Sequence, residues 1–376
     1  MSVKKILING ITLEQATIFP LLLNCRYWLN HECSITFFGN SELKARIKQS
    51  GIFTSYKFVE FSDTKKITNK FQFIFEALRR NIAALPYIYK FRGEFDIVYT
   101  RSSVLDLIIF PYCLKNVDNK IKWLTVFDNI VPLNDPGNKF IRFLSWLFFQ
   151  ISLFFLKKSD MIFTISKDLK QFLIKKEFNE ERIVITGNAV EADTIKQSVK
   201  DIRYSIYALF VGRINETKGI YDMLRVLEIV KREYPGFQLA IMGRGDETTE
   251  HKFQEKIQKL GLKSNIQFLG YKTGIEKFTI MKSSKCFWFL SLSESFGISL
   301  LEAVCCGLPA FAYDLPPYRH IYRNNEVIIV EKNNYLKVAE RVIELFNKND
   351  FKNIKGEELL DRYSWDAIAE VECNSF

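Results

Sequence analysis

The sequence predicts an α/β protein that consists of two doubly wound domains. Short, continuously apolar runs alternate with longer segments of helical periodicity along the 376 residues, a pattern typical of parallel sheets covered by helices on both faces. The alternation stops once, in the polar stretch 191–203, and a second series begins near Tyr207. We therefore expect an N-terminal domain over 1–195, a C-terminal domain over 204–361, and a helix over 362–376 that returns to the N-terminal domain.

The expected strands are the apolar runs themselves, and the helices lie between them. In the first half the runs are Lys5–Asn9, Ser34–Phe38, Asp96–Thr100, Trp123–Phe127, Met161–Ile165 and Ile183–Thr186; in the second half they are Tyr207–Val211, Gln238–Met242, Ile266–Leu269, Cys286–Leu290, Pro309–Tyr313 and Val327–Val330. Each series describes a Rossmann-like sheet, which binds ligands at the carboxyl ends of its strands. Two such domains that face each other with those ends inward form a substrate cleft.

One apolar stretch, Phe140–Leu156, resembles a membrane span. It is at the low limit of length for a span, it contains Arg142 and Gln150, and Lys157 and Lys158 close it. We prefer a core helix as the interpretation. An interfacial helix, with its apolar face in lipid and its lysines at the headgroups, is the main alternative, and a true span is the third.

The excess of positive charge lies in the first half of the chain. The chain has 53 Lys and Arg against 43 Asp and Glu; residues 1–200 hold 29 basic and 19 acidic side chains, whereas 201–376 hold 24 of each. Phenylalanine is skewed in the same direction, with 22 of 34 in the first 200 residues. This asymmetry predicts two different ligands or surfaces, and the basic half suits anionic lipid or nucleic acid. Acidic residues are mixed in throughout, unlike the concentrated face of a nucleic-acid binder, so we expect no nucleic-acid partner.

The cysteines and the first residues point to a reducing, cytoplasmic setting. The seven cysteines are scattered, and the adjacent Cys305 and Cys306 have neither metal-ligand nor redox spacing. An odd number in a chain of this size argues against a secreted disulfide framework. Met1–Asn9 has only a short apolar run, which predicts a buried strand rather than a signal peptide.

The first candidate motif follows the expected strand Tyr207–Val211. Gly212 frees the backbone at the strand end, and Arg213 and Lys218 place two cations at the mouth of the expected cleft. Two cations suit a diphosphate, whose negative charge grows when a sugar departs from it. Taken alone, the motif is explained equally well as a strand–turn–helix with solvated charges.

The second motif, Ser291–Ala303, follows another expected strand. Gly297 allows a ligand to approach closely, and a helix from Ile298 would offer free N–H groups to an anion. Glu294 and Glu302 are eight residues apart, about 12 Å along a helix, which fits poorly to the carboxyl pair of a glycosidase. They suit opposite ends of a longer ligand, sugar at one end and nucleoside at the other. The plain alternative is one exposed and one capping glutamate.

A third motif, Ile241–Asp246, places Gly243 in a Gly-x-Gly turn at a strand end, which is weak evidence for a nucleotide when taken alone. In order and strand position, the three motifs and the Ala303–Pro309 segment resemble glycosyltransferase family 4, the retaining group 1 glycosyltransferases of the GT-B fold. The resemblance is strong from about residue 207 to 363. In the N-terminal half it is loose and rests on Thr164–Lys167 and Gly187–Glu191.

The resemblance implies a role for each matching residue. Arg213 and Lys218 bind the donor diphosphate, Glu302 holds the ribose hydroxyls, Glu294 touches the donor sugar, and Asn188 lies at the domain junction. The implied donor-binding set is Gly10, Gly212, Arg213, Lys218, Gly243, Tyr271, Glu294, Phe296, Gly297, Ile298 and Glu302, and the catalytic set is Glu294, Arg213, Lys218 and Asp128.

Two positions depart from the family pattern. The Gly-Gly loop after the first strand is Asn9–Thr12 here, where Gly10 alone can approach the donor. The family's His-Asp pair is Phe127-Asp128, and none of the three histidines replaces it obviously. In the family this histidine assists at the donor sugar. Here Asp128 or an acceptor-side group would take over part of that role, or the chain is a catalytically weak scaffold or partner subunit.

The resemblance also implies a mechanism in which the anomeric configuration is retained. The acceptor attacks from the front face through an oxocarbenium-like transition state, and the leaving phosphate helps to deprotonate it. There is no Asp-x-Asp placed to hold a metal, so we expect no cofactor and activity that persists in EDTA. A sugar-nucleotide epimerase shares the GT-B plan and is an alternative. UDP- and GDP-linked donors both remain open, because base selection depends on contacts near Gly270 and Tyr271.

The acceptor is expected on the N-terminal domain. The basic and Phe-rich segments Lys65–Lys70, Phe71–Arg80 and Phe140–Lys158 favour a phosphate-bearing, lipid-linked glycan at the inner face of the cell membrane. The reaction would then belong to cell-envelope polysaccharide or glycolipid synthesis. The alternative is that these aromatic residues are core and the lysines only solubilise the surface.

Overall fold

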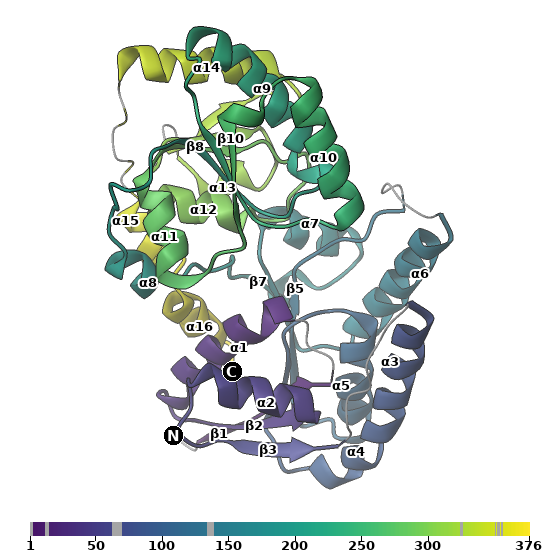
Figure 1. The fold of residues 1–376 in the computed structure, drawn as a ribbon. Coiled ribbons are helices and arrows are strands. Elements are labelled where there is room, and N and C mark those ends of the chain that lie inside the picture. The colour runs from purple at the N-terminus through teal and green to yellow at the C-terminus, as the bar shows by residue number, and fades with distance from the viewer. Residues whose placement is uncertain are drawn as a thin grey trace. The chain divides into compact units, whose positions relative to one another are not determined.

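The chain folds as two compact units. A computed structural model describes residues 3–11, 15–61, 70–133, 139–323, 326–349, 351, 354 and 356–376. The N-terminal unit comprises Met1–Gly187 and Trp365–Phe376, and the C-terminal unit comprises Asn188–Ser364. Each unit has its own parallel sheet, with helices on both faces (Figure 1). The predicted α/β class with two doubly wound sheets is confirmed.

The sheet of the N-terminal unit has seven strands in the order β3-β2-β1-β4-β5-β6-β7. Its α1 and α16 lie on one face, and α3, α5 and α6 lie on the other (Figure 1). The elements are β1 Lys4–Gly10, α1 Gln15–Leu29, β2 Cys33–Gly39, α2 Ser41–Ser50, β3 Lys57–Glu60, α3 Lys70–Ala84, α4 Pro86–Phe91, β4 Ile97–Thr100, α5 Leu105–Val117, β5 Lys122–Phe127, α6 Lys139–Leu156, β6 Met161–Thr164, α7 Lys167–Lys175, the 3-10 helix η1 Glu180–Arg182, β7 Ile183–Ile185 and α16 Trp365–Cys373.

The sheet of the C-terminal unit has six strands in the order β10-β9-β8-β11-β12-β13. Counted from its own first strand, this is the doubly wound order 3-2-1-4-5-6. The elements are α8 Ala192–Gln197, β8 Ile206–Val211, η2 Glu216–Lys218, α9 Ile220–Glu233, β9 Leu239–Met242, α10 Glu247–Lys259, η3 Lys263–Asn265, β10 Ile266–Gly270, α11 Gly274–Ser283, β11 Ser284–Phe289, α12 Ile298–Cys305, β12 Ala310–Tyr313, α13 Tyr318–Ile321, β13 Ile328–Val330, α14 Tyr335–Lys348 and α15 Glu357–Arg362.

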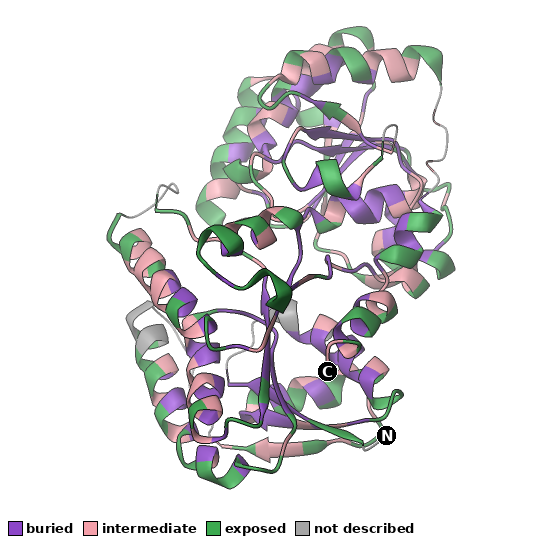
Figure 2. Ribbon diagram, turned by 180° about the vertical axis from the view of Figure 1, so that it is seen from behind, coloured by how far each residue is buried: buried purple, intermediate pink, exposed green. Residues whose placement is uncertain are grey.

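Buried residues follow the central strands and the inner faces of the helices in each unit (Figure 2). Ile6, Leu7 and Ile8 of β1 are all fully buried, because helices cover both faces of the sheet and no side of the strand meets water. Helix starts follow local signals: Asn40 and Ser166 accept hydrogen bonds from the backbone N–H groups of Leu43 and Leu169 as N-caps. Apolar runs and caps thus account for elements such as β1, α2 and α7.

The boundary between the two units lies earlier in the chain than the sequence suggested, at Asn188 instead of after residue 195. Residues 188–198 pack within the C-terminal unit rather than ending the N-terminal one. The ammonium of Lys282 donates to the carbonyl of Ser198 at 2.7 Å, and Val190 forms a bridge with Ser364. The polar composition of 191–203, which suggested a linker, instead reflects a short surface helix, α8, that packs on α11.

Helix α16 completes the core of the N-terminal unit. Its backbone carbonyl at Ala369 accepts from the Trp28 indole at 3.0 Å, and the Glu372 carboxylate accepts from Asn24 at 3.1 Å and from the Tyr99 hydroxyl at 3.0 Å. Burial raises the pKa of Glu372 to about 7, although the nearby Arg101 guanidinium opposes the shift. The buried hydrogen bonds of the Glu372 carboxyl thus join α16 to α1 and β4.

Helix α6 is not the core helix preferred from its sequence. Only Phe149, Ser152, Leu153 and Leu156 of its 18 residues are buried, and Phe140 and Phe154 are 61% and 68% exposed. Among the described residues it is the one helix long and apolar enough to cross a membrane. The helix packs on α5 through one stripe near its C-terminal end, and its other side chains are exposed or half-buried among the described residues. Residues 62–69, which include most of the Lys65–Lys70 segment, lie outside the described part.

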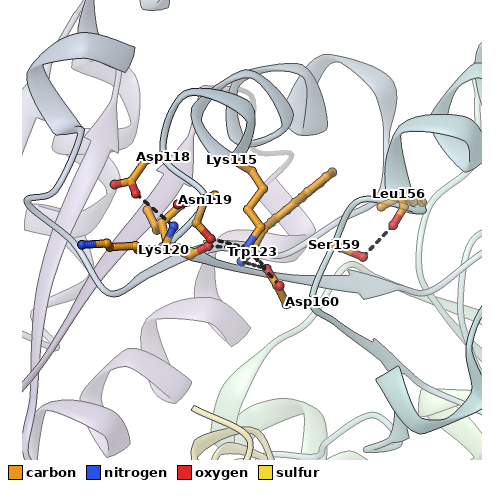
Figure 3. A network of polar contacts seen from close by, with 9 residues as sticks. Lys115, Asp118, Asn119, Lys120, Trp123, Leu156, Ser159 and Asp160 are labelled. Carbon is orange, nitrogen blue, oxygen red and sulfur yellow. Dashed lines mark hydrogen bonds and ion pairs between the residues drawn. The ribbon is translucent and has the colours of Figure 1, made fainter.

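A polar network fixes the turn that follows α6 (Figure 3). The Lys115 ammonium lies 2.8 Å from the Asp160 carboxylate and donates to the carbonyl of Ile121 at 2.7 Å. Asp160 also accepts from the backbone N–H of Trp123 at 2.7 Å, and the Ser159 hydroxyl donates to the carbonyl of Leu156. The C-terminal end of α6 is therefore held to the first residues of β5 and β6.

Candidate donor site

The candidate site lies at the carboxyl ends of two adjacent strands in the C-terminal unit, β8 and β11. The strand order reverses direction between them, and this switch point is where doubly wound sheets bind ligands. Two segments leave the sheet here. We call Asn215–Gly219 the Lys218 turn and Ser291–Gly297 the Glu294 loop.

Backbone contacts hold the Lys218 turn against the Glu294 loop. The carbonyl of Thr217 accepts from the backbone N–H of Leu292 at 2.8 Å and from the Ser291 hydroxyl at 3.1 Å. Gly219 has φ +68°, and a Cβ built on it would lie 1.8 Å from the carbonyl oxygen of Leu290. No side chain fits that space, so glycine is required for this approach of the turn to β11.

The turn brings two of the predicted residues together. The Lys218 ammonium forms an ion pair with the Glu294 carboxylate, which also accepts from the Ser291 hydroxyl at 2.7 Å. The ammonium lies 5.8 Å from the centre of the Phe289 ring. Both members of the pair are largely shielded, with side-chain exposures of 18% and 11%, so their charges act in a reduced dielectric. Arg213, on the loop after β8, is exposed and makes no ion pair within the described residues.

The glycines of the first and third motifs pack against each other. A Cβ on Gly243, whose φ is +151°, would lie 1.8 Å from the carbonyl oxygen of Gly212, and the N–H of Gly212 donates to the carbonyl of Met242 at 3.0 Å. The N–H of Gly243 donates in turn to the carbonyl of Gly270, at the end of β10. These contacts bring together the loops that follow three neighbouring strands. The contacts within the protein are therefore enough to explain the glycine at 243, and no bound ligand is needed to explain it. Tyr271 follows this point and is exposed.

Helix α12 begins at the other side of the Glu294 loop. Gly297 takes φ +87° and is its N-cap residue, and Ile298 is the first residue of the helix. The first N–H groups of a helix have no partner within it and carry partial positive charge. Phe296 is buried and packs edge-on against Tyr363 at 5.6 Å, which fixes the backbone before the helix.

Glu302 lies further along α12 and has a different lysine partner. Its carboxylate lies 2.5 Å from the Lys277 ammonium of α11, while Oε2 is buried and has no hydrogen-bond partner in the described structure. Burial raises the pKa of Glu302, and Lys277 opposes the shift. The two glutamates are thus separate sites, each with its own lysine. Lys277 belongs to no sequence motif, and only the position of α11 reveals it.

The remaining predicted residues belong to the N-terminal unit. Gly10 ends β1, and Asp128 follows β5. Phe127, at the position of the family histidine, is fully buried and stacks on Phe172 with ring centres 6.0 Å apart. The departure therefore replaces a titratable group with a core side chain. Asn188 is the first residue of the C-terminal unit.

Known proteins match this chain in both sequence and fold. The family model for glycosyl transferases group 1 matches residues 191–359. Glycosyltransferase MJ1059 of Methanocaldococcus jannaschii is 28% identical over 270 residues, which are 69% of this chain and 64% of that protein. Phosphatidyl-myo-inositol mannosyltransferase of Mycobacterium leprae is 33% identical over 167 residues, 43% of each chain. GDP-mannose:cellobiosyl-diphosphopolyprenol alpha-mannosyltransferase of Xanthomonas oryzae is 27% identical over 162 residues, 42% of this chain and 43% of that one. The matched part thus spans less than two thirds of these relatives.

Solved structures share the fold over almost the whole chain. The Anabaena protein Alr3699/HepE, in a crystal structure with UDP and glucose, has a TM-score of 0.75 at 12% identity and covers 99% of both chains. Sucrose-phosphate synthase of Thermosynechococcus elongatus has a TM-score of 0.76 at 13% identity and covers 99% of this chain and 98% of its own. The family model covers nearly all of the C-terminal unit, which carries the site. Residues 191–359 thus match the group 1 glycosyl transferases, and the chain has the GT-B fold.

Proposed function

We propose that the protein is a retaining hexosyltransferase that moves a sugar from a UDP- or GDP-linked donor to a lipid-linked glycan in cell-envelope polysaccharide or glycolipid synthesis. The observation that carries the donor side is the shielded pair of Lys218 and Glu294 beside the N-terminus of α12. A cation, a carboxylate and free helix N–H groups at one switch point suit a ligand with a phosphate next to a sugar.

The two glutamates mark the two ends of this donor. Lys218 and the exposed Arg213 would bind the diphosphate, and Glu294 would accept a hydrogen bond from a sugar hydroxyl. Glu302 has a buried oxygen without a partner, and a ribose hydroxyl that donated to it would remove that cost. The separate lysine partners keep both carboxylates in place for different parts of one ligand.

The residues then contribute position and charge rather than a nucleophile. Negative charge grows on the leaving phosphate as the glycosidic bond breaks, and a shielded ammonium close to it stabilises that charge more than water does. A front-face attack, assisted by the same phosphate, would retain the anomeric configuration. Asp128 of the N-terminal unit is our candidate for the group that takes over part of the role of the family histidine at the donor sugar. We propose donor binding without a metal ion.

The proposal for a lipid-linked acceptor rests on two supports. The names of two relatives describe a phosphatidyl-myo-inositol and a cellobiosyl-diphosphopolyprenol substrate. In this chain, the exposed Phe140, Phe143 and Phe154 of α6 and the following lysines offer an apolar face with a basic edge. Such a helix binds an anionic membrane surface by burial of its apolar side chains and by charge.

A panel of UDP, GDP, ADP and their common sugar conjugates, followed by thermal unfolding in EDTA, tests the donor site. One nucleotide should raise the melting temperature of the wild type. Glu302→Ala should weaken the binding of that nucleotide by roughly 10- to 100-fold, because a hydrogen bond to a charged group is lost. Each ligand-induced shift is measured against the same variant without ligand, since Glu302→Ala also leaves the half-buried Lys277 without its ion-pair partner. Glu340→Ala, on the surface of α14, is the matched control. Absence of a shift with every nucleotide would contradict the proposal and favour a scaffold.

Flotation with vesicles tests the membrane surface. The wild type should float with anionic vesicles at low salt, and less with neutral ones. Phe140→Ser combined with Phe154→Ser should lower partitioning by roughly 100-fold or more, from about 1.5 kcal/mol or more per buried Phe. Ile202→Ser removes an exposed apolar side chain from the C-terminal unit and should change nothing. Equal flotation of the double variant would remove α6 from the proposal.

A further inference from the structure

Tyr318 is a buried residue close to the donor site that no motif contains. It opens α13, after β12, and is 2% exposed. Its hydroxyl has no hydrogen-bond partner in the described structure. Buried tyrosine hydroxyls normally find a partner, because an unpaired one costs the full desolvation penalty. A phenylalanine would fill the same space without that cost.

The hydroxyl lies at the N-terminus of α12. A Cβ built on Gly297, the N-cap residue, would lie 3.0 Å from Cε1 of Tyr318 and 3.2 Å from its hydroxyl oxygen. The hydroxyl is therefore close to the backbone that presents the first N–H groups of the helix.

The surroundings of the ring belong to the same site. The Phe289 ring, with its centre 6.5 Å from that of Tyr318, is also the ring beside the Lys218 ammonium. Burial raises the pKa of Tyr318 well above its usual value, and the charge of Glu294 adds to the shift. The phenol therefore stays protonated at neutral pH and is a hydrogen-bond donor.

We propose that Tyr318 is a donor-binding residue whose hydroxyl donates a hydrogen bond to a non-bridging oxygen of the nucleoside diphosphate at the N-terminus of α12. This inference rests on the proposed function, because it needs a nucleotide donor. The ligand supplies the partner that the protein lacks, and the helix N–H groups and Lys218 share the same negative charge.

Binding measurements on Tyr318→Phe test this assignment with the full chain. The probes are the nucleoside monophosphate, diphosphate and sugar diphosphate of the base that stabilises the wild type. We expect the dissociation constant of the diphosphate to rise roughly 10- to 100-fold, since a hydrogen bond to a charged group is lost. The monophosphate should be affected less than twofold if the hydroxyl contacts the second phosphate. The variant without ligand should melt at or above the wild-type temperature, because it no longer buries an unpaired hydroxyl.

Tyr322→Phe is the matched control. Its hydroxyl is also buried without a partner in the described structure, but its electrostatic neighbours are Tyr318, Cys305, Tyr363 and Glu326 rather than Glu294. It should bind every probe like the wild type. A Tyr318→Phe variant that binds the diphosphate normally would overturn the inference and leave the proposed function intact, as would a loss confined to the sugar conjugate. A wild type that binds no nucleotide would overturn both.

Discussion

Replacement of Lys218 by alanine is expected to lower the rate of sugar transfer by roughly 10²- to 10³-fold, as for the loss of one preorganised group that stabilises developing negative charge. The ammonium is held by Glu294 near the Phe289 ring, so it is positioned before the donor arrives. Glu294 keeps its hydrogen bond from Ser291 in the variant, and the fold should survive.

Steady-state transfer assays and thermal unfolding of the same preparations separate these effects. The turnover number should fall, while the melting temperature changes by only a few degrees. Lys337→Ala, which breaks an exposed ion pair with Glu340 on α14, should leave turnover unchanged. Turnover near the wild-type value in Lys218→Ala would refute the role of this cation.

Gly219→Ala should be among the most destabilising single substitutions in the C-terminal unit. The new Cβ would lie 1.8 Å from the carbonyl oxygen of Leu290, and the residue would have to keep φ +68°. The left-handed conformation alone costs about 1 kcal/mol. With the backbone displacement we expect about 3 kcal/mol or more, a fall in melting temperature of roughly 6–12 °C, and loss of donor binding as the Lys218 turn moves.

Gly261→Ala separates the two contributions. Gly261 also has a left-handed φ, +63°, but a Cβ there would meet nothing within 4 Å. Gly261→Ala should therefore lower the free energy of unfolding only by the cost of the left-handed conformation, about 1 kcal/mol. If the two variants unfold at the same temperature, the close approach of the Lys218 turn to β11 is not what requires glycine at 219.

Much of the fold was predictable because parallel strands with both faces covered have a plain signature. Ile6–Ile8 and Phe287–Phe289 are apolar without alternation, and each is buried in its sheet. Strand β3 was missed because it lies at the sheet edge and has only two apolar residues, Phe58 and Val59, between the charged Lys57 and Glu60. For α6, apolar composition predicted burial, yet composition does not say whether a neighbouring element covers a face.

The geometry of the candidate site was predictable where a backbone conformation requires a particular residue type. Gly212 and Gly219 indicate turns. Glu294 precedes Gly297 by three residues in the sequence, and Glu302 follows it by five. The Lys277 ammonium meets Glu302 only because α11 and α12 pack on the same sheet, and Tyr318 reaches Gly297 from beyond another strand. Such long-range neighbours have no periodic or local signal, so sequence patterns alone could not supply them.

The return of α16 to the N-terminal unit affects the order in which the chain can fold during synthesis. The C-terminal unit is continuous, from Asn188 to Ser364, and all of it has been translated before Trp365 is added. The N-terminal unit cannot cover Trp28 and Tyr99 with α16 until after that. The unit whose synthesis begins first is therefore completed last, because α16 is translated only after the whole of the C-terminal unit.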